Sequence, residues 1–280
     1  MALDFRIIAA LPREWMGNPE MKDQFEREAR TVAALNHPHI RTMHDIGSED
    51  GTDFLVMEYL EGQTLAERLE RGPLAPDEAL KAAIAIADAL DKANRKGIVH
   101  GGLKPATIML SKSGIKLMDF GLARIQDAGN AAASPSMVAT GTAAAPEMTP
   151  GTIEYMAPER FEGRPTPART FFAFGTILHE MITGKKAFEG KSRAVLIASI
   201  TTVEPEPLSK LQPKISPALD HVVARCLAKD PAGRVSQRRF ATEPSSRLVG
   251  RSQTTLIVVP VGGLRVRRSA RCPWVGLPRA

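Results

Sequence analysis

One polar segment constrains the fold of this 280-residue chain more than any other. It runs His100-Gly-Gly-Leu-Lys-Pro-Ala-Thr107, and the triplet Asp119-Phe-Gly121 follows twelve residues after its end. The apolar runs around these residues predict three short strands, at 98–100, 108–110 and 115–118. Lys104 and Asp119 are therefore expected on loops between strands, with Asp119 directly after the last strand.

Most strand signals in the chain precede most helix signals. Apolar runs bounded by turn residues predict strands at 5–11, 40–46 and 53–59. Apolar residues at helical spacing, with Pro or polar starts and Gly or Pro stops, predict helices at 21–35, 76–96, 171–183, 193–201 and 217–229. Strands first and helices afterwards indicate an α+β fold with two unequal lobes.

Two segments lack such signals. Residues 126–150 are rich in Ala, Ser, Thr, Pro and Gly and are expected to form a mobile loop. Residues 241–280 hold seven Arg, no Lys and one acid, which leaves 30 basic and 30 acidic residues before them. We interpret this tail as a disordered extension, as an Arg-rich phosphate-binding segment, or as sequence unrelated to the rest of the chain. Because the excess charge is confined to it, there is no strong case for nucleic acid or a membrane as a partner.

The cysteine content indicates a reducing compartment. Cys226 and Cys272 are too few and too isolated for a disulfide framework or a zinc cluster. The chain contains no run of about 18 apolar residues, and its first four residues lack the basic start of a secretory signal. A cytoplasmic location is therefore expected.

Nine short motifs follow one another along the chain: Phe25-Glu-Arg-Glu-Ala-Arg30, Leu35-Asn-His-Pro38, Val56-Met-Glu-Tyr-Leu-Glu-Gly62, Gly97-Ile-Val-His100, Leu103-Lys-Pro105, Asp119-Phe-Gly-Leu-Ala123, Gly151-Thr152, Tyr155-Met-Ala-Pro-Glu159 and Asp230-Pro231 with Arg234. In this order they resemble the eukaryotic-type serine/threonine protein kinase family in its bacterial form. The resemblance covers about residues 5–240. It implies a small β-rich N-lobe at 1–60 that lacks the family's first two strands, a larger, mainly helical C-lobe at 61–240, and a tail at 241–280.

The resemblance implies ATP and magnesium as cofactors and a protein as substrate or partner. It assigns contact with the transferred phosphoryl group to Lys104 and a magnesium ligand to Asp119. Glu28 matches the helix Glu that pairs with a strand Lys beside the nucleotide. The other positions that it implies for nucleotide binding are Met57, Glu58, Leu60 and Met109.

The same resemblance implies two structural features. One is a buried ion pair between Glu159 and Arg234 that braces the larger lobe. The other is an apolar column that links the lobes and is formed by Val32, Met43, His100 and Phe120. His100 is accordingly interpreted as a core residue and not as an acid–base catalyst.

Several positions that carry the family's chemistry hold other residues here. Gly102 stands at the position of the catalytic Asp, Thr107 at that of the metal-binding Asn, and Ala9 at that of the strand Lys. Gly101 replaces the Arg that receives an activating phosphate, and no Gly-rich loop precedes Asp4. Phosphoryl transfer needs charge stabilisation, positioning and a proton acceptor. We therefore expect a catalytically impaired pseudokinase or decayed fragment with at most a binding or scaffolding role.

Other interpretations stay open. Lys104 is either a phosphate contact or a solvated or loop-bracing residue, and Asp119 either faces a metal or lies on the surface. Glu28 is expected to lack its cationic partner, and little or no binding of magnesium is expected. The alternative function is an active ATP-dependent serine/threonine kinase that uses Lys104 and Asp119, and a third possibility is a chain without function.

Overall fold

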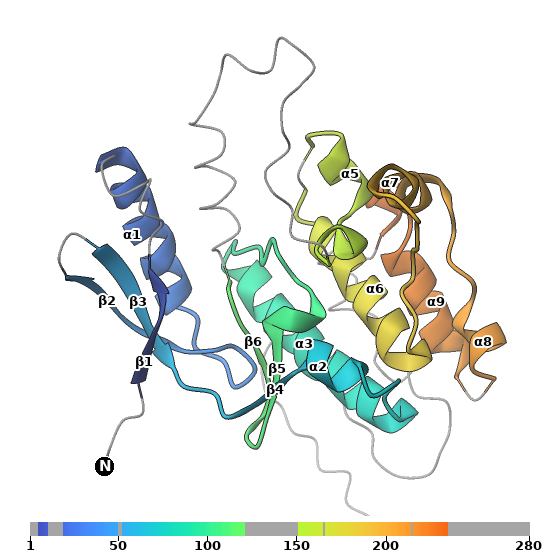
Figure 1. Ribbon diagram of the computed structural model, residues 1–280, viewed down its shortest axis with the longest axis horizontal. Coiled ribbons are helices and arrows are strands. Elements are labelled where there is room, and N and C mark those ends of the chain that lie inside the picture. Colours follow the sequence, from blue (N-terminus) through green and yellow to red (C-terminus); the bar gives the residue numbers. More distant parts are fainter. Residues whose placement is uncertain are drawn as a thin grey trace, which may run out of the picture.

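The computed structural model describes residues 5–10, 19–49, 52–120, 151–164, 166–213 and 215–234, which form two lobes (Figure 1). The smaller lobe holds an antiparallel sheet with the strand order β1-β3-β2. Its elements are β1 (Phe5–Ala10), α1 (Pro19–Ala33), β2 (Met43–Glu49) and β3 (Thr52–Glu58). The first three predicted strands and the first predicted helix are thus confirmed, with their ends shifted by a few residues.

The larger lobe begins with a second sheet, in the order β4-β5-β6, and continues with helices. In Figure 1, α3, α6 and α9 lie side by side, and α6 packs against both of the others. The strands are β4 (Gly62–Thr64), β5 (Ile108–Ser111) and β6 (Gly114–Leu117). The helices are α2 (Leu65–Leu69), α3 (Pro76–Arg95), α5 (Pro158–Phe161), α6 (Arg169–Thr183), α7 (Arg193–Thr202), α8 (Leu208–Leu211) and α9 (Pro217–Cys226), with 3₁₀ turns η2 (Pro105–Thr107), η4 (Ile153–Tyr155) and η5 (Pro231–Gly233).

Helix α3 forms where it was predicted because the sequence specifies both of its ends. Pro76 fills the first helical position, where no N–H is needed, and acidic residues follow in the first turn. At the other end Gly97 adopts a φ of 73°, and the Ile98 N–H donates to the Ala93 carbonyl at 3.0 Å. This Schellman closure uses the backbone of Ile98. The strand predicted at 98–100 is therefore wrong, because its first residue closes the helix instead.

Helix α6 is the most buried helix of the larger lobe, and a glycine lets its neighbour approach closely. A Cβ on Gly175 would lie 2.7 Å from the Cβ of Cys226 in α9, so no larger residue fits without movement. Gly184 ends α6 with a φ of 70°, as the predicted stop required. Helix α9 ends at Cys226, earlier than the predicted 229, because Asp230-Pro231 begins a separate turn.

The four side chains of the predicted apolar column are all buried. Val32 comes from α1, Met43 from β2, and the rings of His100 and Phe120 have centroids 4.5 Å apart. On α1, Ala29 and Val32 are buried whereas Ala33 is exposed, and Leu35 after the helix is buried as well. The side chain of Phe25, the loop predicted at 126–150 and the tail at 241–280 lie outside the described residues.

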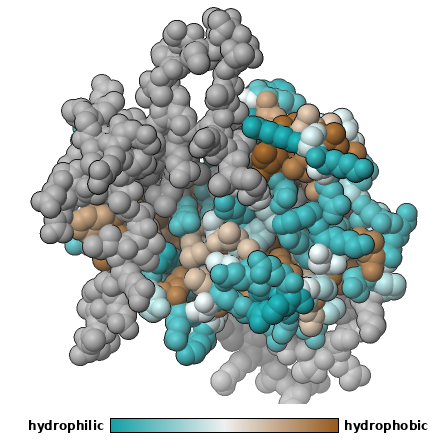
Figure 2. Space-filling model, viewed as in Figure 1, coloured by the Kyte–Doolittle hydropathy of each residue, from teal (hydrophilic) through white to brown (hydrophobic). Residues whose placement is uncertain are grey.

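The described surface is mostly polar. Figure 2 shows teal over most of the coloured surface, with separate brown patches between. Among the described residues, the exposed large apolar side chains are Tyr59, Val195 and Val203. None of the described helices combines the length and the apolar character that a bilayer-crossing helix requires.

A buried ion pair joins α5 to the segment after α9. Arg234 donates to both carboxylate oxygens of Glu159, at 2.6 and 2.8 Å, and the two side chains are 0% and 4% exposed. The Arg234 guanidinium also donates to the carbonyls of Ala228 and Lys229, at 2.7 and 3.0 Å. Burial opposes ionisation of Glu159, but these contacts outweigh it and keep the pKa of its carboxyl below the ordinary value. The predicted bracing pair is therefore present, with its charges fully satisfied.

Replacing Arg234 with Met should leave the Glu159 carboxylate buried without a cation. We expect the free energy of unfolding to fall by about 3–5 kcal/mol, measured by urea denaturation followed by circular dichroism. The control is Arg95→Met, which breaks the more exposed 2.7 Å pair with Asp91 and should cost less than about 1 kcal/mol. Similar losses in the two variants would contradict a special role for the buried pair.

Candidate functional site

A single hydroxyl holds the loop between α3 and β5 in shape. Thr107, in the 3₁₀ turn η2, is buried, and its Oγ1 accepts from the Lys104 N–H at 3.1 Å. The same hydroxyl donates to the Lys104 carbonyl at 2.9 Å, with the Gly102 carbonyl at 3.5 Å. A hydroxyl has one hydrogen to donate, so that of Thr107 is committed to its own loop. Gly102, beside it, carries no side chain.

The side chain of Lys104 connects this loop to the segment that follows residue 150. Its Nζ donates to Thr152 Oγ1 at 3.0 Å. Lys104 is half-buried and lies directly before η2. In the structure the amine therefore braces two loops, and its contact with a phosphoryl group stays a prediction.

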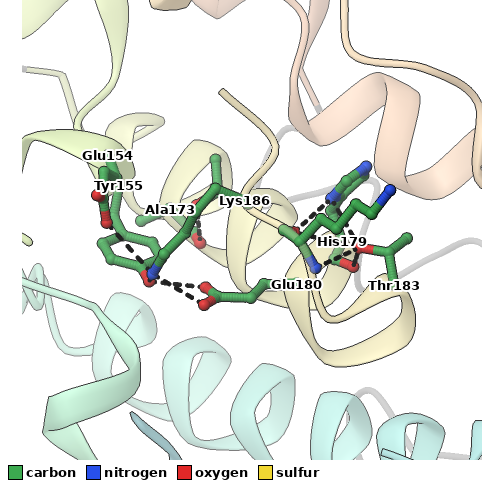
Figure 3. A network of polar contacts seen from close by, with 9 residues as sticks. Glu154, Tyr155, Ala173, His179, Glu180, Thr183 and Lys186 are labelled. Carbon is green, nitrogen blue, oxygen red and sulfur yellow. Dashed lines mark hydrogen bonds and ion pairs between the residues drawn. The ribbon is translucent and has the colours of Figure 1, made fainter. Parts of the chain in front are cut away.

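A polar network holds the Thr152 segment against α6 (Figure 3). The Tyr155 hydroxyl, on the 3₁₀ turn η4, donates to Glu180 of α6 at 2.6 Å. Lys186 then forms ion pairs with Glu180 at 2.8 Å and with Glu154 at 3.2 Å. Burial and the nearby carboxylates raise the pKa of Tyr155, so it remains a donor at any physiological pH. The η4 turn, which directly follows the Lys104 partner Thr152, is thereby held against α6.

Asp119 has an unusual backbone conformation at the end of β6. Its φ of 61° is the only positive value among the described residues other than glycine. Asp tolerates this left-handed region better than most residues, although at a cost of about 1 kcal/mol or more. The side chain reaches solvent, but the protein atoms around it reduce its hydration and raise the pKa of the carboxyl. Arg41 and Lys104 are the cations that oppose this shift.

The residues predicted to contact a nucleotide lie at the junction of the two lobes. Met57 at the end of β3 and Leu60 after it are buried, and Met109 in β5 is half-buried. The Glu58 carboxylate accepts from the Thr42 N–H at 3.1 Å and from Lys116 Nζ at 2.8 Å. Burial disfavours the charge of Glu58, but these two donors outweigh it and lower the pKa of its carboxyl. The negative charge of Glu58 is thus already balanced by Lys116.

Arg41 was not identified from the sequence, yet its guanidinium lies at this junction. Its Nε donates to the Glu58 carbonyl at 2.9 Å, and its backbone N–H donates to the Leu117 carbonyl at 2.9 Å. Burial lowers the pKa of the guanidinium, and the carboxylates of Asp119 and Glu58 oppose that shift. A charged residue directly after the buried Ile40, in a stretch predicted as strand, is the signal that the sequence contained.

Two predicted residues are placed only by their backbones. Ala9 pairs with Leu55 in the β1–β3 ladder, and Glu28 lies within α1. Nothing is described of their side chains, so the predicted lack of a partner for Glu28 stays a prediction. The absence of a cation at position 9 follows from the sequence itself.

The residues around Asp119 do not fit a resident magnesium ion. Magnesium prefers six oxygen ligands and is usually held by one or two carboxylates together with phosphates. Within the described ranges, no group of three or more His, Cys, Asp or Glu side chains could hold a metal ion. Two cations act on Asp119, and the Thr107 hydroxyl oxygen, at the second expected ligand position, already accepts from the Lys104 N–H at 3.1 Å. The local charge opposes a dication.

Comparison with known proteins defines the class of this domain. The sequence profile described as the protein kinase domain matches residues 13–244. The chain therefore belongs to the protein kinase domain family, and its two lobes are those of the protein kinase fold. The kinase domain of Mycobacterium tuberculosis PknI has the same fold, with a TM-score of 0.58, 27% identity, and coverage of 82% of this chain and 80% of that chain.

The curated relatives are bacterial serine/threonine kinases. A probable serine/threonine-protein kinase of Streptomyces coelicolor, SCO3848, is 38% identical over 80% of this chain and 33% of its own length. PknB of Mycolicibacterium smegmatis is 34% identical over 84% of this chain and 38% of its own length. PknD of Mycobacterium tuberculosis is 37% identical over 82% of this chain and 34% of its own length. The chain thus spans roughly a third of the length of these relatives.

The buried His100 should make the domain sensitive to acid. Its ring is 1% exposed, and neither ring nitrogen makes a well-directed hydrogen bond to a described residue. Burial lowers its pKa to about 4, against which the nearby backbone carbonyls act only weakly. Between the folded pKa of about 4 and the unfolded pKa of about 6.5, only the unfolded chain takes up this proton. The free energy of unfolding is therefore not reduced by His100 above pH 6.5, and it decreases as the pH falls from 6.5 towards 4.

Unfolding of wild type and of His100→Leu should be compared between pH 7.5 and pH 4.5. We expect the wild type to lose up to about 3 kcal/mol more than the variant over this range, since 1.36 kcal/mol corresponds to one pKa unit. The carboxylates that titrate at low pH are common to both proteins and cancel in the difference. Parallel pH profiles would show that His100 is not the group responsible.

Proposed function

We propose that this domain is a protein-kinase-like module with impaired phosphotransfer, whose remaining role is to bind a protein partner. The observation that carries the proposal is the state of the catalytic loop. Position 102 is Gly and offers no proton acceptor, while the Thr107 hydroxyl and the Lys104 amine are engaged in holding the loop itself. A loop of this kind keeps the shape of a kinase without its reactive groups.

The expected loss of rate is large. A general base alone contributes about 10²–10⁴ in rate, and groups that act as a unit do not contribute additively. With Gly102, Thr107 and Ala9 at three of the family's functional positions, the residual rate should lie far below the roughly 1–100 s⁻¹ of active kinases. A binding role needs only the folded lobes, which the buried core and the Glu159–Arg234 pair support.

The names of the relatives favour the alternative function, an active serine/threonine kinase that uses ATP and magnesium. In that case Lys104 and Asp119 would be its surviving catalytic groups, and the protein would be a substrate-phosphorylating transferase. The division into lobes at 1–60 and 61–240 applies to both proposals, as does the cytoplasmic location inferred from the two isolated cysteines.

Transfer of labelled phosphate from ATP to a generic basic protein separates the two functions. We expect the wild-type rate to be indistinguishable from that of Lys104→Ala, because the proton acceptor is missing in both proteins. Lys112→Ala, which removes an exposed lysine paired with Glu61, is the matched surface control. If the wild type and Lys112→Ala both transferred phosphate and Lys104→Ala did not, the domain would be an active kinase.

A further inference from the structure

The amine of Lys229, in the segment after α9, lies against aromatic rings. Its Nζ is 4.1 Å from the centroid of the Phe188 ring and 5.7 Å from that of the Phe172 ring. The two rings are stacked, with their centroids 5.6 Å apart, and both residues are buried. An ammonium group over an aromatic face is stabilised by the ring electrons. The rings therefore replace water on this side of the cation.

The same amine holds the end of α7. It donates to the carbonyl of Ile200 at 2.7 Å, and Ile200 is fully buried. Ile200 lies in the last turn of α7, where the carbonyls lack partners within the helix. A cation at this end also interacts favourably with the helix dipole. Lys229 thus joins the end of α7 to the segment after α9.

These surroundings make the amine more available as a nucleophile than that of an ordinary lysine. Burial lowers the pKa of Lys229 to about 8; the charge of Glu204 opposes this shift, and that of Arg234 adds to it. At pH 7.5 about a quarter of these amines carry no proton, against about 0.1% for a lysine with the ordinary pKa of about 10.4. Lysines desolvated by apolar neighbours serve as nucleophiles for this reason.

We propose that Lys229 is a site of acylation by a small activated acyl donor, either an acyl phosphate or an acyl thioester. The neutral amine attacks the carbonyl carbon of the donor and forms an amide N–C bond. The C–O bond to phosphate or the C–S bond to the thiol breaks, and the leaving group keeps its electron pair. The proton that the amine loses passes to water. The inference is independent of the proposed function, which uses none of these residues.

Acylation removes the charge that holds the end of α7. A neutral amide has no cation–π attraction to Phe188, and its hydrogen bond to the Ile200 carbonyl is no longer strengthened by charge. Helix α7 contacts both α5 and the η4 turn. We therefore expect acylation to loosen α7 and to weaken its packing on these two elements.

The test is the rate of acetylation at each lysine of the full chain, followed by peptide mass spectrometry with acetyl phosphate and, separately, with acetyl-coenzyme A. With at least one donor, Lys229 should react about tenfold or more faster than Lys96, because its larger unprotonated fraction outweighs its lower basicity. Lys96 is the internal control, since its Nζ also donates to a backbone carbonyl, that of Ala34 at 2.6 Å, but on the exposed surface. Comparison of the two donors identifies the source of the acyl group.

Removal of the aromatic ring should slow the reaction. In Phe188→Leu the amine becomes more hydrated, so the rate at Lys229 should fall towards that at Lys96. If this variant does not fold, which circular dichroism would show, the wild type provides a second test. Its rate of acetylation at Lys229 should level off above about pH 8, where the amine has lost its proton.

Lys229→Gln imitates the loss of charge, and Lys229→Arg keeps the charge. Hydrogen exchange should show the backbone amides of α7 exchanging about threefold or more faster in Lys229→Gln than in the wild type, since the cation–π contact is lost. Lys229→Arg should exchange as the wild type does.

Three results would overturn the inference. They are equal rates at Lys229 and Lys96 with both donors, a rate at Lys229 that keeps rising well above pH 8, and equal exchange of α7 in the Gln and Arg variants. Phosphate transfer dependent on Lys104 would remove the proposed function and leave this inference standing.

Discussion

Two hydrogen bonds to the backbone of Leu117 hold the two lobes in register. The Leu117 N–H donates to the carbonyl of His39, and the Arg41 N–H donates to the carbonyl of Leu117, each at 2.9 Å. Backbone bonds of this kind are insensitive to side-chain identity, so the junction keeps its geometry where the side chains around it differ from the family pattern. Both Arg41, from the smaller lobe, and Asp119, from the larger one, take their places from it.

The larger lobe is held together in part by buried polar side chains that form their hydrogen bonds and ion pairs with one another. Glu159 and Arg234 neutralise each other out of contact with water, and Tyr155, Glu180 and Lys186 hold the η4 turn on α6. Lys104 reaches Thr152 in that same region. Lys104, which the family resemblance places at the transferred phosphoryl group, thus joins two segments of the fold in this structure. The proposed loss of phosphotransfer is compatible with this scaffold, because a fold and the chemistry carried on it are separable.

How well the sequence predicted each element depended on how local its determinants are. The ends of α3 and α6 were predicted because Pro76, Gly97 and Gly184 specify them within a few residues. The prediction of a strand at 98–100 was wrong because apolar residues at these positions fit a strand and a helix closure equally well. The hydrogen bond from Ile98 to the Ala93 carbonyl decides between the two. The buried ion pair followed from the family resemblance.

The sequence predicted several individual residues of the site but not the contacts between residues from distant parts of the chain. Lys104, Thr107 and Asp119 were identified by their positions in motifs, whereas the bond of Lys104 to Thr152 spans 48 residues and has no signal in the sequence. Arg41 was missed for a related reason. Its neighbour Asp119 is brought to it by the pairing of Ile40 with Leu117, which joins parts of the chain that local patterns treat separately.

The proposed loss of phosphotransfer depends on the absence of a proton acceptor at Gly102 and on the lack, among the described residues, of a sufficient set of magnesium ligands around Asp119. Crystals of the domain grown with a non-hydrolysable ATP analogue and manganese, with data collected at the manganese absorption edge, test it most directly. We predict no anomalous peak beside Asp119. An ordered analogue with two manganese ions bridging its phosphates to Asp119 would contradict it.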